Sequence, residues 1–207
     1  MKSCFLFAFL LIVGCADNLP TGHGTSGNPL QPPGLIPTEL GLRWVYVDSL
    51  FQKGTVSVEY DTVRIAGSRN DGGRVWWRLE GGATAMSVLF REYMVEADTV
   101  RTLQRDMVGS EIAGLVFLPP RPQPFTYSML VGGDAMMGIT ATPGNGPLSI
   151  PAGTYTNWTN YAFDVGLEHG SWTIEPGVGI LRYVMDASEY SERPAFQLTS
   201  TLVAVLR

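Results

Sequence analysis

Apolar and polar residues alternate along short segments of this chain, and such segments make up most of it from residue 38 onward. The segments are rich in β-branched and aromatic residues, and Gly, Pro, Asn or Asp stands between them. Alternation of period two between turn-forming residues is typical of β-strands. No segment keeps a helical period over ten or more residues. The pattern predicts strands at residues 42–48, 55–65, 74–80, 87–97, 99–106, 113–118, 155–165, 171–175, 178–187 and 195–206.

These segments predict an all-β body of about ten antiparallel strands. Tyr155, Tyr161 and Phe163 share one face of segment 155–165, whereas Trp158 lies on the other. Aromatic residues on both faces fit a curved sheet or half-barrel with an apolar hollow for a ligand. They fit equally a two-sheet sandwich in which both faces are core. The alternation alone leaves both architectures open.

Two stretches rich in turn-forming residues predict connections between strands. Residues 66–73 (AGSRNDGG) predict a turn. Residues 118–125 (LPPRPQPF) predict a crossing, which is followed by a loop around Gly132 and Gly133. Neither stretch is expected to add a strand.

The first fifteen residues differ from the rest of the chain. Lys2 precedes a run of nine apolar residues, 5–13, which is shorter than the roughly 20 residues that span a bilayer. A positive residue before such a run is typical of a secretory signal peptide. Residues 12–15 (IVGC) end the run and resemble the lipobox of bacterial lipoprotein precursors.

The lipobox resemblance implies cleavage after Gly14 and lipid on the sulfur and the new amine of Cys15. Stable anchoring needs more than one acyl chain, because each buried methylene contributes only about 0.8 kcal/mol. Ala16 follows Cys15, whereas Asp at this position retains enterobacterial lipoproteins in the inner membrane. The resemblance therefore implies an outer-membrane lipoprotein that faces the periplasm.

Three parts are expected along the chain: a signal peptide at 1–14, a lipidated Cys15 with a flexible tether to residue 37, and one all-β domain at 38–207. Residues 16–37 hold five Pro and four Gly and no apolar period. Such a composition is typical of a linker.

Composition narrows the function classes. The chain has 207 residues, of which 45% are hydrophobic and 16% charged, so one folded domain with a core is expected. Loss of Lys2 from the 14 basic residues leaves 13 against 19 acidic ones, a charge of −6. This charge offers no basic footprint for nucleic acid. With Cys4 in the signal peptide and Cys15 acylated, no thiol remains for disulfides or metal ligation.

The sequence offers little for catalysis. His23 and His169 are its two histidines; His23 lies in the tether, and His169 precedes Gly170 and is expected in a turn. No Ser-His-Asp set, metal-ligand cluster or phosphate-binding loop can be assembled from the chain. We therefore expect no enzyme activity, no cofactor and no metal.

One strand carries a candidate contact surface. In segment 74–80, Val75, Trp77 and Leu79 are expected on the core face, and Arg74, Trp76 and Arg78 on the outer face. Trp76 could be a surface cation–π stack sheltered by the arginines, or it could line a binding surface, because Trp and Arg are enriched at binding hot spots. A bulge at the preceding turn would exchange Trp76 for Trp77.

Three motifs, together with the lipobox and the tether, resemble a broad group of uncharacterised bacterial envelope lipoproteins. They are GLRWVY at 41–46, PAGTY at 151–155 and PGVGIL at 176–181. A looser similarity, in architecture only, links the expected body to half-barrel lipoprotein carriers of the periplasm. The resemblance carries no chemistry, since the motifs mark strand entries and turns.

Two non-catalytic functions follow as expectations. The first is a binding or carrier module for an apolar or amphipathic ligand, held at the membrane by the lipid on Cys15. The alternative is a structural or assembly accessory that binds envelope proteins. A hydrolase ranks below both.

Overall fold

The computed structural model describes residues 34–81, 91–96, 98–105, 111–131, 135–189 and 194–207. Cys15 and His23 lie outside these residues. Within them the chain forms fourteen β-strands and no helix. The described part therefore contains no helix long and apolar enough to cross a membrane.

The strands are β1 (Arg43–Gln52), β2 (Thr55–Asp71), β3 (Arg74–Gly81), β4 (Glu92–Glu96), β5 (Thr99–Arg105), β6 (Glu111–Phe117), β7 (Phe125–Val131), β8 (Ala135–Pro143), β9 (Leu148–Ile150), β10 (Gly153–Tyr155), β11 (Thr159–Val165), β12 (Glu168–Glu175), β13 (Gly179–Ala187) and β14 (Phe196–Leu206).

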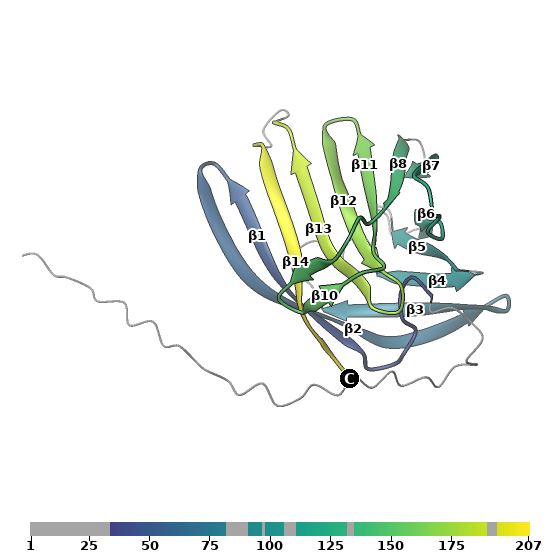
Figure 1. Cartoon of the computed structure of the whole chain (residues 1–207). Coiled ribbons are helices and arrows are strands. Elements are labelled where there is room, and N and C mark those ends of the chain that lie inside the picture. The colour runs from purple at the N-terminus through teal and green to yellow at the C-terminus, as the bar shows by residue number, and fades with distance from the viewer. Residues whose placement is uncertain (1–33, 82–90, 97, 106–110, 132–134, 190–193) are drawn as a thin grey trace, which may run out of the picture. The chain divides into compact units, whose positions relative to one another are not determined.

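Twelve of the strands form one antiparallel sheet in the order β6-β5-β4-β3-β2-β1-β14-β13-β12-β11-β8-β7, and β9 and β10 form a separate hairpin. The sheet curves so strongly that its two ends, β6 and β7, come to lie near each other (Figure 1). The all-β, antiparallel, curved-sheet prediction is confirmed, with fourteen described strands instead of about ten. The alternative of a two-sheet sandwich is not adopted, because a single sheet wraps round the core.

In the part of the chain that the structure describes, the bonds between the two ends of the sheet involve side chains and no backbone ladder. The hydroxyl of Tyr127 on β7 donates to the carbonyl oxygen of Val116 on β6 at 2.8 Å. The backbone N–H of Val116 points to Sδ of Met129 at 3.4 Å. Tyr161 on β11 donates to the carbonyl oxygen of Leu118 at 2.8 Å. The first two bonds join the end strands β6 and β7, and the third joins β11 to the residue that follows β6.

Aromatic rings from β6 and from the β11–β13 strands pack against one another. Phe117 packs edge-on against Tyr161 and Trp172, with ring centres 5.4 and 5.2 Å apart. Phe163 stacks on Trp172 at 4.3 Å. Such pairs contribute about 0.5–1.5 kcal/mol each beyond the burial of their area. The curvature of the sheet therefore brings its two halves into one common core.

The N-terminal segment of the described chain also belongs to this core. Leu35 and Ile36 expose only 2% and 6% of their surface. The carbonyl oxygen of Pro37 accepts a hydrogen bond from Tyr93 on β4. The packed body therefore begins a few residues before the expected boundary at Thr38.

Two expected connections contain strands instead. β2 does not end at Ile65, because a bulge between Ile65 and Gly67 lets it continue to Asp71. The turn shrinks to Gly72 and Gly73, whose φ angles of 57° and 84° suit a tight hairpin turn.

The expected loop after residue 125 is likewise wrong in its described part. β7 and β8 pair there as a hairpin. Met137 and Ile139 on β8 are buried in the core, which is why the segment is extended and ordered by packing. Gly132 and Gly133 lie outside the described residues.

Candidate functional site

Trp76 and Trp77 lie on opposite faces of β3. Trp77 packs against the core, and Trp76 is half-buried on the outer face. The guanidinium carbon of Arg69, on β2, lies 5.8 Å from the centre of the Trp76 ring, within the range of a cation–π contact. The cation over the ring is thus a cross-strand neighbour and not Arg74 or Arg78, the flanking residues that the sequence suggested.

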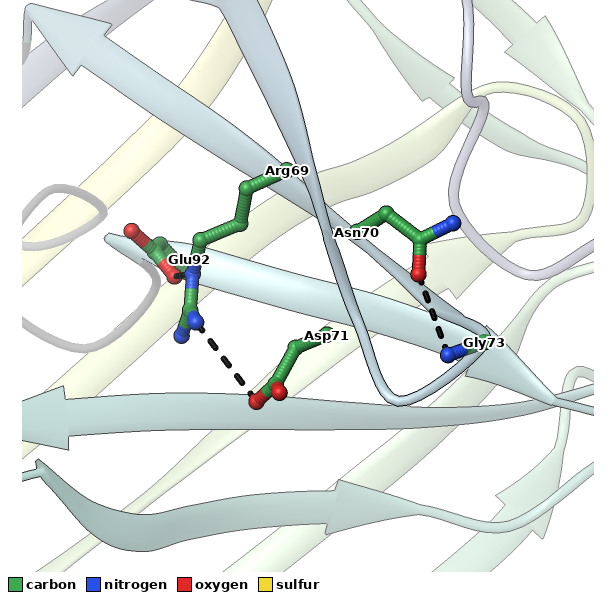
Figure 2. Close-up of polar contacts among 5 residues, drawn as sticks. All are labelled: Arg69, Asn70, Asp71, Gly73 and Glu92. Atoms are coloured by element: carbon green, nitrogen blue, oxygen red, sulfur yellow. Dashed lines mark hydrogen bonds and ion pairs between the residues drawn. The ribbon is translucent and has the colours of Figure 1, made fainter.

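Carboxylates hold Arg69 in this position. Its Nε lies 2.7 Å from Oε2 of Glu92 on β4, and its Nη1 lies 3.7 Å from Oδ2 of Asp71 (Figure 2). In the adjacent turn the backbone N–H of Gly73 donates to Oδ1 of Asn70 at 3.1 Å (Figure 2). These ion pairs therefore fix the guanidinium of Arg69 beside the Trp76 ring.

A second group of charges lies farther along the same face. Glu80 accepts from Arg64 and Arg78, each at 2.9 Å. Arg43 stands directly opposite Arg64 in the β1–β2 register. A shallow hollow of about 400 Å³ lies here, lined by Arg43, Thr62, Arg64, Glu80 and Gly81. Its lining is charged, so it does not suit an apolar ligand.

Exposed apolar side chains gather on the outer face of the β1–β2 hairpin. Phe51, Val56, Val58 and Tyr60, together called the hairpin strip, expose 48, 59, 59 and 76% of their surface. In the register Phe51 lies opposite Val56, and Tyr60 lies opposite the half-buried Val47. Contiguous exposed apolar surface is typical of a contact site, whereas scattered apolar residues are ordinary.

The strip lies beside a strand edge. β2 pairs with β1 over residues 55–64 but with β3 only over residues 63–71. Among the residues that the structure describes, none pairs with the other edge of β2 from Thr55 to Thr62. Gly81, the last residue of β3, has a φ of 83°, a conformation that favours glycine.

The strip was missed by the sequence reasoning, although the sequence carries a signal for it. Val56, Val58 and Tyr60 occupy even positions, whereas the buried Val63 and Ile65 occupy odd ones. The β1–β2 register has no bulge between them. A change of phase without a bulge means that the apolar face of the strand switches sides. The first half of β2 therefore presents its apolar residues outward.

His169 and the acidic side chains of the described residues were compared with the arrangements that catalysis or metal binding requires. His169 lies in β12, not in a turn as expected, with its side chain 61% exposed and Nε2 3.9 Å from Oδ2 of Asp186. No group of three or more His, Cys, Asp or Glu side chains that could hold a metal ion occurs in the described part of the chain.

The buried tyrosines serve as internal hydrogen-bond donors. Burial raises the pKa of Tyr127 to about 12. It also raises the pKa of four others, Tyr46, Tyr93, Tyr161 and Tyr183. Tyr46, for example, donates to the carbonyl oxygen of Ile180 at 2.9 Å, which links β1 to β13 across β14. Their hydroxyls stay protonated and structural at neutral pH.

Two solved structures resemble this fold. One is a candidate lipoprotein of Parabacteroides distasonis, 11% identical, with a TM-score of 0.45 over 85% of this chain and 100% of that chain. The other is a candidate exported protein with a YmcC-like fold from Bacteroides fragilis, 9% identical, with a TM-score of 0.42 over 84% of this chain and 100% of that chain. No protein-family model and no curated protein matches the sequence.

Proposed function

We propose that this protein is a lipid-anchored, non-catalytic docking module of the bacterial envelope, and that the hairpin strip is its contact surface for another envelope protein. The observation that carries the proposal is the gathering of Phe51, Val56, Val58 and Tyr60, 48–76% exposed, on one face of one hairpin. Tyrosine is among the residues that contribute most at protein interfaces, and Tyr60 is the most exposed member.

The charge of the chain favours a protein over a bilayer as the occupant of the strip. Without Lys2 the chain has 13 basic and 19 acidic residues. Glu59 and Asp61 alternate with the strip residues along β2. Carboxylates so close to the strip disfavour approach to an anionic lipid surface.

The interior of the sheet favours docking over carriage of an apolar ligand. A carrier needs an apolar cavity on the concave side of the sheet. In the described part of the chain, Phe117, Tyr161 and Trp172 are in mutual contact there. The accessory function therefore ranks above the carrier function.

The anchor of the proposed module is the lipid on Cys15, at the outer membrane. If the 18 residues from 16 to 33 behave as a flexible coil, their root-mean-square end-to-end distance would be roughly 25 Å. Intact mass of the protein extracted from membranes tests the anchor. The mass of a chain starting at Cys15 with acyl groups supports it, and a Cys15→Ser chain that stays equally membrane-bound contradicts it.

Differential cross-linking in whole cells tests the contact surface. The variant Val58→Ser with Tyr60→Ser removes the centre of the strip. The matched control, Leu130→Ser with Met136→Ser, removes two residues of β7 and β8 that are 56% and 60% exposed. Cross-linked envelope proteins, identified by mass spectrometry, should fall about tenfold with the first variant, as expected for loss of a hot spot. Equal recovery from both variants would exclude the strip.

A further inference from the structure

We infer that the end of the body at which the tether enters rests on the bilayer that holds the lipid on Cys15. Leu40, Leu206 and Arg43, together called the basal patch, would make this contact, the leucines in the headgroup region and the arginine at the lipid phosphates. This inference rests on the proposed lipid anchor and extends it, and it does not depend on the hairpin strip.

The tether joins the body beside the first strand. The carbonyl oxygen of Gly34, the first described residue, accepts a hydrogen bond from the backbone N–H of Gly177 at 2.8 Å. The carbonyl oxygen of Val178 accepts from Nε1 of Trp44, the second residue of β1, also at 2.8 Å. The chain therefore leaves for Cys15 next to the start of β1 and the turn between β12 and β13.

The basal patch lies at this same end of the sheet. Arg43, the first residue of β1, lies directly opposite Leu206 on β14. Leu40 precedes Arg43 by three residues. The ion pair between Nε of Arg207 and Oε2 of Glu39, at 3.7 Å, places the end of β14 beside this segment. Figure 1 shows the end of β14, marked C, at the other end of β1 from the turn into β2.

The apolar members of the patch suit the surface of a bilayer. Leu40 and Leu206 expose 61% and 46% of their surface. Exposed leucines enter the boundary between headgroups and acyl chains, while an arginine beside them keeps its guanidinium among the headgroups. Two leucines flanking Arg43 therefore form a small amphipathic contact.

Charge favours lipid phosphates at this end, although the chain as a whole is acidic. Arg43 is exposed and lies directly opposite Arg64 in the β1–β2 register. Like charges directly opposite each other are unfavourable, and an anionic phosphate beside Arg43 would relieve their repulsion. The carboxylate of Glu39, next to Leu40 in the chain, is offset by its ion pair with Arg207.

The lipid anchor allows so small a patch to act. Two leucines and one arginine bury too little surface to hold a free protein on a bilayer. A tether of 18 residues keeps the patch near the membrane and raises its effective concentration there. Phe51 of the hairpin strip lies eight residues beyond Arg43 on β1, about 27 Å for an extended strand. The strip would therefore point away from the bilayer, toward other envelope proteins.

Photo-cross-linking of the full lipidated chain in vesicles of phosphatidylethanolamine and phosphatidylglycerol tests this contact. A photoreactive phenylalanine replaces Leu40 or Leu206. The matched control is Leu167, 47% exposed in the turn between β11 and β12, at the other end of β12 from Gly177. Phospholipid adducts, identified by mass spectrometry, should be about tenfold more abundant from positions 40 and 206 than from position 167, because only inserted side chains touch lipid.

The substitution Arg43→Gln, in the chain that carries the probe at position 206, tests the arginine. It should lower the yield of phospholipid adducts about fivefold, the effect of one arginine near an anionic surface. The control Arg74→Gln removes an exposed arginine at the start of β3 and should leave the yield unchanged. An equal effect of the two substitutions would contradict the role given to Arg43.

Equal adduct yields from positions 40, 206 and 167, or no phospholipid adducts from 40 and 206, would overturn the contact when the mass of the chain shows the lipid on Cys15. The proposed docking function would then stand, because the serine variants of the hairpin strip measure protein contact separately. A chain without lipid on Cys15 would contradict the anchor and the basal contact together.

Discussion

Tyr127 on β7 donates a hydrogen bond to the carbonyl oxygen of Val116 on β6, with 2.8 Å between the two oxygens. These residues belong to strands at opposite ends of a twelve-stranded sheet. Their bond replaces the backbone ladder that would otherwise close the sheet. The hydroxyl of Tyr127 therefore helps to keep the two end strands of the curved sheet together.

Tyr127→Phe should lower the free energy of unfolding by about 1 kcal/mol, the usual net value of an intramolecular hydrogen bond. The control is Tyr155→Phe, which removes a longer bond of 3.4 Å to Ala152 and should cost less than half as much. Urea unfolding followed by tryptophan fluorescence measures both. An equal loss of unfolding free energy in the two variants would show that the bond between β7 and β6 contributes no more to stability than the longer bond of Tyr155.

The sequence predicted the strand class and much of the strand positions, because alternation survives in segments such as Arg74–Gly81. Trp76 lies on the outer face, as the alternation in this segment predicted, because the two-residue turn before β3 adds no bulge. The strands β7 and β8 were not predicted, because the Pro and Gly residues near them indicated a loop more strongly than the short alternations indicated strands. The hairpin strip was not predicted, because alternation does not show which face of a strand is covered by the rest of the protein. That property depends on packing between segments far apart in the chain.

The aromatic core gives a prediction about Trp172. Its side chain is 1% exposed, and Nε1 has no hydrogen-bond partner among the described residues. Trp172→Ala should cost about 3–5 kcal/mol through the cavity it leaves. Trp172→Phe keeps an aromatic ring and removes the unsatisfied N–H, so it should cost markedly less. Thermal unfolding of both variants measures the difference, and equal losses would contradict the role given to ring packing.

High pH should unfold the protein cooperatively. Burial raises the pKa of Tyr46, Tyr93, Tyr127, Tyr161 and Tyr183 above the ordinary value of about 10. Their contribution to stability is present below pH 10 and is lost as the pH rises through their folded pKa values. Each group reduces the free energy of unfolding by up to about 1.4 kcal/mol per pH unit in that window.

Tyrosinate absorbance and circular dichroism, followed together in an alkaline titration, measure this effect. The buried tyrosines should ionise in the same transition in which the sheet signal is lost. Complete ionisation of all tyrosines near pH 10 with the sheet signal intact would contradict the burial of these side chains.

The contact between Arg69 and Trp76 gives a separate prediction. Trp76→Ala should lower the stability by about 1 kcal/mol, because it removes a cation–π contact and the packing beneath Arg69. Capture of envelope proteins should be unchanged. A loss of capture of about 2 kcal/mol with unchanged stability would instead make Trp76, with Arg74 and Arg78, a binding hot spot.

Photo-cross-linking from position 60 in living cells tests whether the hairpin strip contacts another envelope protein. A photoreactive phenylalanine replaces Tyr60 in one strain and Met136, 60% exposed on β8, in the other. We expect an adduct with a defined envelope protein from position 60 and no such adduct from position 136. Adducts with lipid alone from position 60, or the same adducts from both positions, would contradict it.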